Sequence, residues 1–351
     1  MKRLSIFMLN ILLFAACSQR QDPITPPWAN HLETADSTSF DLTAIQQAGE
    51  LIGLTLSGPD TYYSYHGRHL GTQYLLGERF AKEIGVRLRM EVCRDSAELY
   101  ARLSAGDGDI ILLPIDTVKH STPGWKVGQG KTLLVEAIQS WYSPKILEDV
   151  RLEEKHMFSQ PLVHRRVYAP MLSRGVISHY DSFFRNYAKS IGWDWRLLAA
   201  QCYQESTFDP RAQSWAGAKG LMQIMPGTAD HLGLSRDDMH DPEKSISAAT
   251  RYLRELDCEL SDVHDHYERQ NLVLASYNGG LHHVRDAMRL AKRDGKNPHV
   301  WEQVKPYVLR LSQPKYFRDS LVQAGYMRGE ETVEYVDHIR ERYMKYRKSA
   351  R

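Results

Sequence analysis

The sequence carries almost no net charge. Its 45 lysine and arginine residues nearly balance 43 aspartate and glutamate residues, which leaves a formal charge of +2. The basic residues are scattered along the chain and form no patch, so the sequence gives no electrostatic basis for nucleic acid as a partner. Hydrophobic residues make up 42% of the chain and charged residues 25%, which is ordinary for a globular protein and excludes a disordered one.

Cysteine is scarce, with four residues in 351. No CxxC motif and no cysteine–histidine cluster with metal-ligand spacing is present, so we predict neither a metal site nor a cofactor. Beyond Cys17 the chain has Cys93, Cys202 and Cys258, and this odd number predicts at least one free thiol or an intermolecular bond. Cys202 can pair with Cys258, but their spacing does not favour that pair over three buried thiols.

The sequence also lacks an apolar run long enough to span a membrane. Residues 4–16 are apolar apart from Ser5 and Asn10, and they follow two basic residues. A spanning helix needs about 20 apolar residues, so this run indicates a secretion signal over residues 1–16. The Ala-Ala-Cys sequence that ends it resembles a bacterial lipobox, which implies that Cys17 is lipidated. The alternative is an ordinary signal peptide that contains a cysteine.

Residues 17–47 are rich in proline, threonine and serine and predict a tether. Residues 48–143 then alternate between strand and helix patterns. Strands are expected at residues 51–56, 86–92 and 109–115, and helices around Phe80 and Leu103. This order predicts an α/β unit with a parallel sheet.

The α/β unit resembles the first lobe of periplasmic solute-binding proteins, most clearly in residues 74–86 and 103–115. Residues 125–141 have the pattern of a returning strand and a closing helix, and the chain between residues 115 and 125 is too short for a second lobe. The ligand cleft between two lobes is therefore expected to be missing. We interpret the lobe as a packing or spacer module rather than a sensor, and expect catalysis to be self-contained in the region that follows.

Residues 144–173 predict a connector, and helical periodicity dominates residues 174–351. Trp195, Leu198 and Cys202 form one apolar helix face, and the same face continues to Glu205. A carboxyl group on an apolar face is partly desolvated, which raises its pKa and suits it to act as a general acid near neutral pH. The alternative is a glutamate at a helix end that faces solvent.

Three short motifs follow one another in this region. They are Glu-Ser at 205–206, Gly-Leu-Met-Gln at 220–223 and Ala-Ser-Tyr-Asn at 275–278. Each alone is weak evidence, because such residues also pack in cores or end helices. In this order, and with the matching segments 193–210 and 241–256, they resemble the catalytic domain of lytic transglycosylases related to the soluble family. The whole chain resembles the membrane-bound lytic transglycosylase F family in a truncated form.

This resemblance implies an α+β, multidomain protein in which the α/β solute-binding-like single lobe precedes an all-α lysozyme-like domain. It also implies a role for each matched residue. Glu205 corresponds to the lone catalytic acid/base, and the residues expected to bind substrate are Ser206, Met222, Gln223, Tyr277, Asn278 and Tyr335.

The implied reaction is non-hydrolytic cleavage of peptidoglycan glycan strands between N-acetylmuramic acid and N-acetylglucosamine, which gives 1,6-anhydro ends. Two alternatives remain, a lysozyme-like peptidoglycan hydrolase and an inactive wall-binding lipoprotein. The lipid anchor would attach the protein to a membrane of the cell envelope. Ser18 stands where enteric bacteria use aspartate to retain lipoproteins at the inner membrane, so we expect the outer membrane, with the protein facing the periplasm.

Overall fold

The computed structural model describes residues 41–113, 123–159, 168, 170, 172 and 175–350. These residues belong to one compact unit, Phe40–Arg351. The predicted signal sequence, Cys17 and most of the predicted tether lie outside the described residues. In the described part of the chain, no helix has the length and apolar character needed to cross a membrane.

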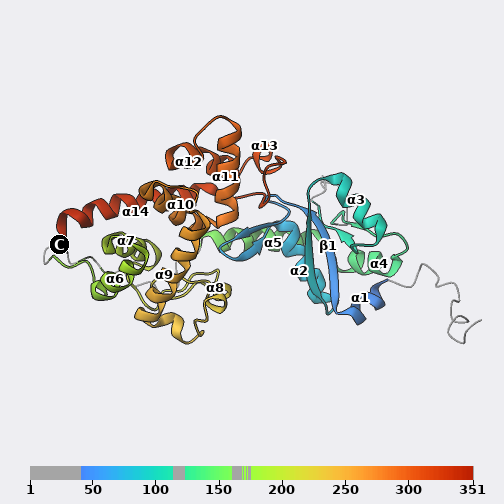
Figure 1. Ribbon diagram of the computed structural model, residues 1–351. Coiled ribbons are helices and arrows are strands. Elements are labelled where there is room, and N and C mark those ends of the chain that lie inside the picture. The colour runs from blue at the N-terminus through green and yellow to red at the C-terminus, as the bar shows by residue number, and fades with distance from the viewer. Residues whose placement is uncertain are drawn as a thin grey trace, which may run out of the picture. The chain divides into compact units, whose positions relative to one another are not determined.

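The N-terminal part is a mixed α/β structure built on a four-stranded sheet (Figure 1). Its strands are β1 (Glu50–Leu56), β4 (Arg87–Cys93), β5 (Ile110–Ile111) and β6 (Lys126–Val127), in the order β4-β1-β5-β6. β1 is parallel to both β4 and β5, whereas β6 is antiparallel to β5. The expected strand–helix order and parallel pairing are therefore confirmed.

Helices cover this sheet and complete its core. They are α2 (Thr72–Glu83), α3 (Ser96–Ala105) and α4 (Thr132–Trp141). Phe80 of α2 is fully buried, and its ring lies 5.9 Å from that of Trp125 and 5.2 Å from that of Trp141. Segments at the two ends of the α/β part therefore share one core.

The folded part extends beyond the range expected from the sequence at both ends. Helix α1 (Leu42–Ala48) lies where the tether was expected, and its Ile45 is fully buried. Asp41 caps α1 and accepts hydrogen bonds from the backbone N–H groups of Leu133 and Leu134 at 2.7 and 3.0 Å. Helix α5 (Pro144–Ser159) occupies the first half of the expected connector and buries Val150 in the same core.

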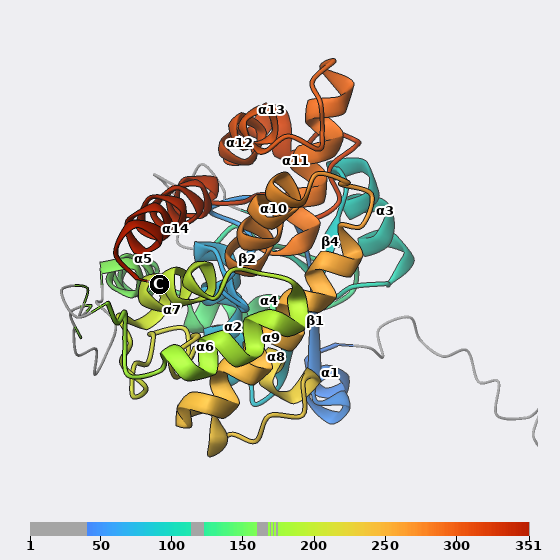
Figure 2. The same ribbon diagram turned by 60° about the vertical axis from the view of Figure 1, so that its left-hand side comes forward.

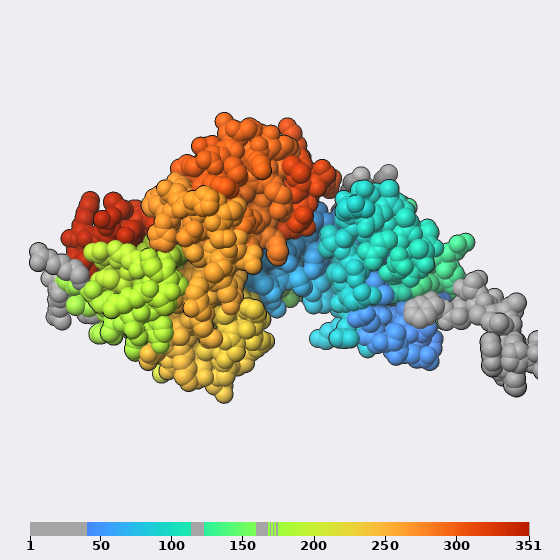
Figure 3. Space-filling model, viewed as in Figure 1, coloured from blue at the N-terminus to red at the C-terminus, as the bar shows by residue number. Residues whose placement is uncertain are grey.

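A short hairpin between β1 and α2 was not predicted. It consists of β2 (Tyr63–Tyr65) and β3 (Arg68–Leu70), joined by His66 and Gly67. Both turn residues have positive φ, 46° and 68°, as a type I′ turn requires. The Tyr63 ring packs against Tyr326 of the helical part at 5.0 Å. The blue segment that contains the hairpin accordingly lies against the orange segment in Figure 3.

The C-terminal part is mostly helical (Figure 2). Its helices are α6 (Asp181–Ala188), η3 (Lys189–Ile191), α7 (Trp195–Ser206), α8 (Pro226–His231), η4 (Asp238–His240), α9 (Pro242–Glu259), α10 (His266–Gly279), α11 (Leu281–Arg293), α12 (Trp301–Arg310), α13 (Pro314–Phe317) and α14 (Gly329–Ser349). Helix α7 packs against α6 and α14. Aspartates at the N-caps of α7, α9 and α10 accept hydrogen bonds from the first-turn N–H groups and fix where these helices begin.

Three cysteines fall within the described residues, and none forms a disulfide. Cys93 and Cys202 are buried, and Cys258 is exposed. The pairing of Cys202 with Cys258 is thus absent from this structure, and so is burial of all three thiols.

Candidate active site

Glu205 lies in the last turn of α7. The helix ends at Thr207 and Phe208, which both take left-handed φ values of 53° and 64°. The apolar face expected from the sequence is present, because Leu198 and Cys202 are fully buried. Glu205 itself is half-buried, so one side of its carboxyl group faces protein and the other opens outward.

The open side of Glu205 faces a cleft of about 1060 Å³. Its walls come from the end of α7, the 214–228 segment, the end of α10, the start of α14 and the tip of the β2–β3 hairpin. The cleft is large, and its lining combines aromatic, aliphatic, polar and charged side chains.

One oxygen of Glu205 is held by a tyrosine from a distant helix. The Tyr335 hydroxyl donates to Glu205 Oε1 at 2.5 Å and accepts a hydrogen bond from Gln201 Nε2 at 3.2 Å. Tyr335 is 4% exposed, so its position is set by packing. Because Oε1 is engaged as an acceptor, a proton on the carboxyl group resides on Oε2.

Burial raises the pKa of Glu205 to about 7, and three neighbours modify this effect. The hydrogen bond from Tyr335 and the positive charge of His66 oppose the rise, while the negative charge of Glu331 adds to it. Near neutral pH, Glu205 therefore exists in both protonation states. A group of this kind can donate a proton in one step and accept one in the next.

The other carboxylates lining the cleft, among the described residues, are Glu331 and Glu334. Both oxygens of Glu331 are occupied, one by the Tyr65 hydroxyl and the other by His66 Nε2 at 2.9 Å. Burial alone would raise the pKa of Glu331, but these hydrogen bonds and the charge of His66 lower it. Glu331 is therefore an ionised group held by the hairpin.

Two aspartates close to Glu205 in sequence have structural roles. Asp194 caps α7 and pairs with Arg196 at 2.7 Å. Asp209 is buried and accepts a hydrogen bond from the N–H of Arg211 at 2.9 Å. Neither lines the cleft.

Four of the expected binding residues line the same cleft as Glu205. They are Gln223, Tyr277, Asn278 and Tyr335. Gln223 Nε2 donates to the carbonyl groups of Ala212 and Gly220 at 3.1 and 2.9 Å. The oxygen of Asn278 accepts a hydrogen bond from Thr332 at 2.7 Å.

Ser206 and Met222 are placed differently from the expectation. Ser206 is fully buried, and its hydroxyl donates to the Cys202 carbonyl at 3.2 Å, one turn back in the helix. Met222 is also fully buried, and its carbonyl accepts the hydroxyl of Tyr277 at 2.8 Å. Neither side chain lines the cleft, so both residues pack beneath the wall of the site.

The sequence reasoning missed the contribution of the hairpin. Tyr65, His66 and Gly67 line the cleft, so the N-terminal part supplies some of its wall. The interpretation as a packing or spacer module did not include this contribution to the cleft wall, and self-contained catalysis by the helical part stays a prediction. The sequence signal was weak, because His-Gly is a poorer turn signal than Asn-Gly.

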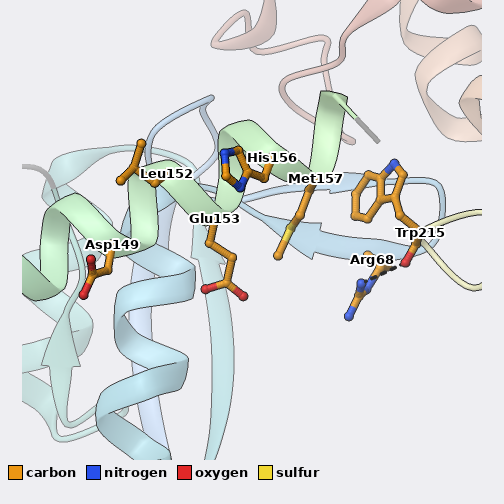
Figure 4. Close-up of a pocket in the computed structure, with 7 residues that line it drawn as sticks. All are labelled: Arg68, Asp149, Leu152, Glu153, His156, Met157 and Trp215. Atoms are coloured by element: carbon orange, nitrogen blue, oxygen red, sulfur yellow. Dashed lines mark hydrogen bonds between the residues drawn. The ribbon is translucent and has the colours of Figure 1, made fainter. Parts of the chain in front are cut away.

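A smaller cavity of about 480 Å³ is lined by Arg68 of the hairpin, by Trp215 and by residues of α5 (Figure 4). Trp215 lines both the cavity and the cleft. Arg68 of β3 donates to the Trp215 carbonyl at 3.3 Å, and its guanidinium group lies 5.8 Å from the centre of the indole ring. The two contacts attach the hairpin to the 214–228 segment.

Comparison with known proteins identifies the helical part. The sequence model of the family described as Transglycosylase SLT domain matches residues 182–300. That range contains Glu205, Gln223, Tyr277 and Asn278, whereas Tyr335 lies beyond it.

Relatives extend the similarity to the rest of the chain. The membrane-bound lytic murein transglycosylase F of Salmonella paratyphi B is 28% identical over 420 residues, covering 86% of this chain and 80% of the relative. The protein of the same name from Shewanella frigidimarina is 41% identical over 168 residues, 48% of this chain and 34% of its own length. The 70 kDa soluble lytic transglycosylase of Escherichia coli is 22% identical, covering 58% of this chain and 27% of that chain with a TM-score of 0.36.

The family model and the two transglycosylase F relatives confirm the resemblance expected from the motifs. The helical part contains a transglycosylase SLT domain, and the chain is a relative of the membrane-bound lytic murein transglycosylases F. The alignment with the Salmonella protein is longer than this chain. That relative therefore has residues inside the aligned region for which this chain has no counterpart.

Proposed function

We propose that this chain is a peptidoglycan lytic transglycosylase in which Glu205 is the single acid/base catalyst. The observation that carries the proposal is the state of Glu205 within the matched domain. It is half-buried in a large cleft, one oxygen is fixed by Tyr335, and its pKa is raised to about 7. The relatives are named for action on murein, which is peptidoglycan.

In the first step, protonated Glu205 donates from Oε2 to the glycosidic oxygen between N-acetylmuramic acid and N-acetylglucosamine. The bond breaks through an oxocarbenium-like state, and the acetamido group of the substrate stabilises the cationic carbon. In the second step, ionised Glu205 removes the proton of the muramoyl 6-hydroxyl, and that oxygen closes a 1,6-anhydro ring. Water is not consumed, and Glu205 ends protonated again.

The surrounding residues fit this sequence of steps. Tyr335 keeps Oε1 in place while Oε2 loses and regains the proton. Gln223 lines the cleft, and its amide nitrogen is fixed by the carbonyl groups of Ala212 and Gly220. Tyr277 and Asn278 line the cleft with Glu205, and their polar atoms are fixed by Met222 and Thr332.

A lysozyme-like hydrolase would need a second carboxyl group to activate water or form a covalent intermediate. Both oxygens of Glu331 already accept hydrogen bonds from the hairpin, which argues against that role for Glu331 and leaves Glu334 as the other carboxylate at the cleft among the described residues. The raised pKa of Glu205 argues against an inactive wall-binding protein. Burying a carboxyl group destabilises the fold when the group is ionised, and such groups are typical of catalytic sites.

Loss of the acid/base group tests the assignment. Glu205→Gln keeps the shape of the side chain but cannot deliver the proton, so release of soluble fragments from purified wall should fall by at least about 10²- to 10⁴-fold. Glu259→Gln, at an exposed position on α9, is the matched control and should retain full activity. Substantial activity in Glu205→Gln would place the catalyst elsewhere.

We further propose that the protein acts in the cell envelope as an outer-membrane lipoprotein facing the periplasm, anchored through Cys17. The names of the relatives support a membrane-bound enzyme, and the Ala-Ala-Cys segment supplies a lipidation site. Cys17→Ala should lose acyl labelling and leave the membrane fraction. An unlabelled wild-type protein that remains with the membrane would contradict the anchor.

The α/β part is proposed to be a reduced solute-binding-like lobe. The parallel β4-β1-β5 arrangement and the residues missing relative to the Salmonella protein both support a single remaining lobe. A half-open lobe cannot enclose a small ligand. Calorimetry of the full chain with free amino acids should therefore detect no saturable binding, and micromolar binding would refute the proposal.

A further inference from the structure

The hairpin turn places a histidine in an unfavourable backbone conformation. His66 occupies the first central position of the type I′ turn with φ of 46°, where asparagine or glycine is preferred. Residues other than glycine held in this region cost free energy and persist where the surrounding structure fixes them. The turn would form more easily with asparagine, so the backbone conformation does not explain why a histidine is at this position.

The turn is held against the helical part on several sides. His66 and Tyr65 both bind Glu331 of α14. The Tyr65 ring stacks on Trp215 at 6.0 Å and 14°. A Cβ atom on Gly67 would lie 3.2 Å from the Met225 side chain, so the turn sits close to the 214–228 segment. These contacts make the hairpin tip a fixed part of the cleft wall.

Only one of the two ring nitrogens of His66 forms a hydrogen bond within the described residues. Nε2 binds Glu331, and among the described residues Nδ1 has no hydrogen-bond partner. The side chain lines the cleft and keeps 30% of its surface exposed. Burial would lower the pKa of His66, but the hydrogen bond and charge of Glu331 raise it, which favours the form in which Nδ1 also carries a proton.

We infer that His66 is a substrate-binding residue, and that its Nδ1 donates a hydrogen bond to a hydroxyl or acetamido oxygen of the glycan strand. Glu331 orients the ring from the opposite nitrogen, as carboxylates commonly do for functional histidines. The hairpin of the N-terminal part is then one wall of the saccharide site. This inference rests on the proposed function, since the ligand is the glycan strand on which Glu205 acts.

The test is His66→Asn, because asparagine suits the turn and removes the imidazole. The variant should unfold no earlier than wild type, while kcat/KM on soluble uncrosslinked glycan strands should fall about 10-fold or more, the loss of one hydrogen bond from a charged donor. Most of the loss should appear in KM, because the bond is made to bound substrate before the reaction.

His69→Asn is the matched control in the same hairpin. His69 is exposed, binds Tyr62 and does not line the cleft, so this variant should keep the wild-type KM. Wild-type KM and kcat in His66→Asn would overturn the inference. A fall in kcat/KM that appears equally in His69→Asn would also overturn it, since the effect would then come from the hairpin as a whole.

Failure of this inference differs from failure of the proposed function. If only the role of His66 is wrong, Glu205→Gln is inactive and His66→Asn behaves as wild type. If the proposed function is wrong, wild-type products carry hydrolytic ends or Glu205→Gln remains active, whatever His66→Asn does.

Discussion

Replacing Glu205 with glutamine should make the protein more stable at neutral and alkaline pH. Burial raises the pKa of Glu205 from its ordinary value of 4.5 to about 7. The folded state therefore binds a proton more tightly than the unfolded state. Stability from this group is fully present below about pH 4.5 and is lost as pH rises through about 7. Glutamine resembles the protonated form at every pH, so it avoids this loss.

The magnitude follows from the difference between the two pKa values. At about 1.4 kcal/mol for each pKa unit, the full penalty above pH 7 approaches about 3 kcal/mol. Glu205 is half-buried beside a cleft open to water, which reduces the penalty, so we expect a gain of about 1–3 kcal/mol at pH 8. At pH 4 the gain should be close to zero, because both states are then largely protonated.

Urea unfolding of wild type and Glu205→Gln at pH 4 and pH 8 measures this difference. Glu259→Gln removes a negative charge from the surface and controls for a change in net charge. The reasoning would be refuted if Glu205→Gln were no more stable than wild type at pH 8, or if its gain were the same at both pH values. Either result would mean that the fold does not desolvate the carboxyl group.

Three further outcomes follow from the structure. Wild-type activity on purified wall should decline as pH rises through about 7, where Glu205 loses its proton. A rate that does not change between pH 6 and pH 9 would contradict a glutamic acid donor. Tyr335→Phe removes a hydrogen bond to Glu205, so the alkaline limb of the profile should move to higher pH; movement to lower pH would show that Tyr335 does not stabilise the carboxylate. Asp286→Ala leaves Arg289 and the N–H groups of Gln323 and Ala324 without their shared partner, and calorimetry should show a loss of about 3–5 kcal/mol, whereas a loss under about 1 kcal/mol would contradict the buried network.

Local patterns predicted the elements whose hydrophobic residues follow a regular spacing. The buried strand at residues 51–56 and the helix face leading to Glu205 were readable because side-chain periodicity reports which face is buried. The first and last residues of the folded α/β part could not be predicted in this way. Ile45 and Val150 are buried by partners far along the chain, so neither the tether-like composition nor the charged helix around Val150 indicated packing.

The motifs predicted which segments form the candidate site, but they did not predict which side chains face the cleft. Adjacent motif residues can point to opposite sides, which is why Glu205 faces the cleft while Ser206 bonds back to its own helix. Met222 similarly turns its side chain into the core and offers only its carbonyl. His66 reaches the cleft through the packing of a hairpin against a distant helix, and no local pattern encodes that contact.

The chemical nature of the product tests the central claim most directly. Purified peptidoglycan digested by the wild-type protein should give fragments ending in 1,6-anhydromuramic acid, about 18 Da lighter than the hydrolytic fragments because no water is added. These fragments should resist borohydride reduction, and they should be absent from a digest with Glu205→Gln. Mass spectra dominated by reducible ends, each heavier by one water, would show that water is the acceptor and would contradict the account.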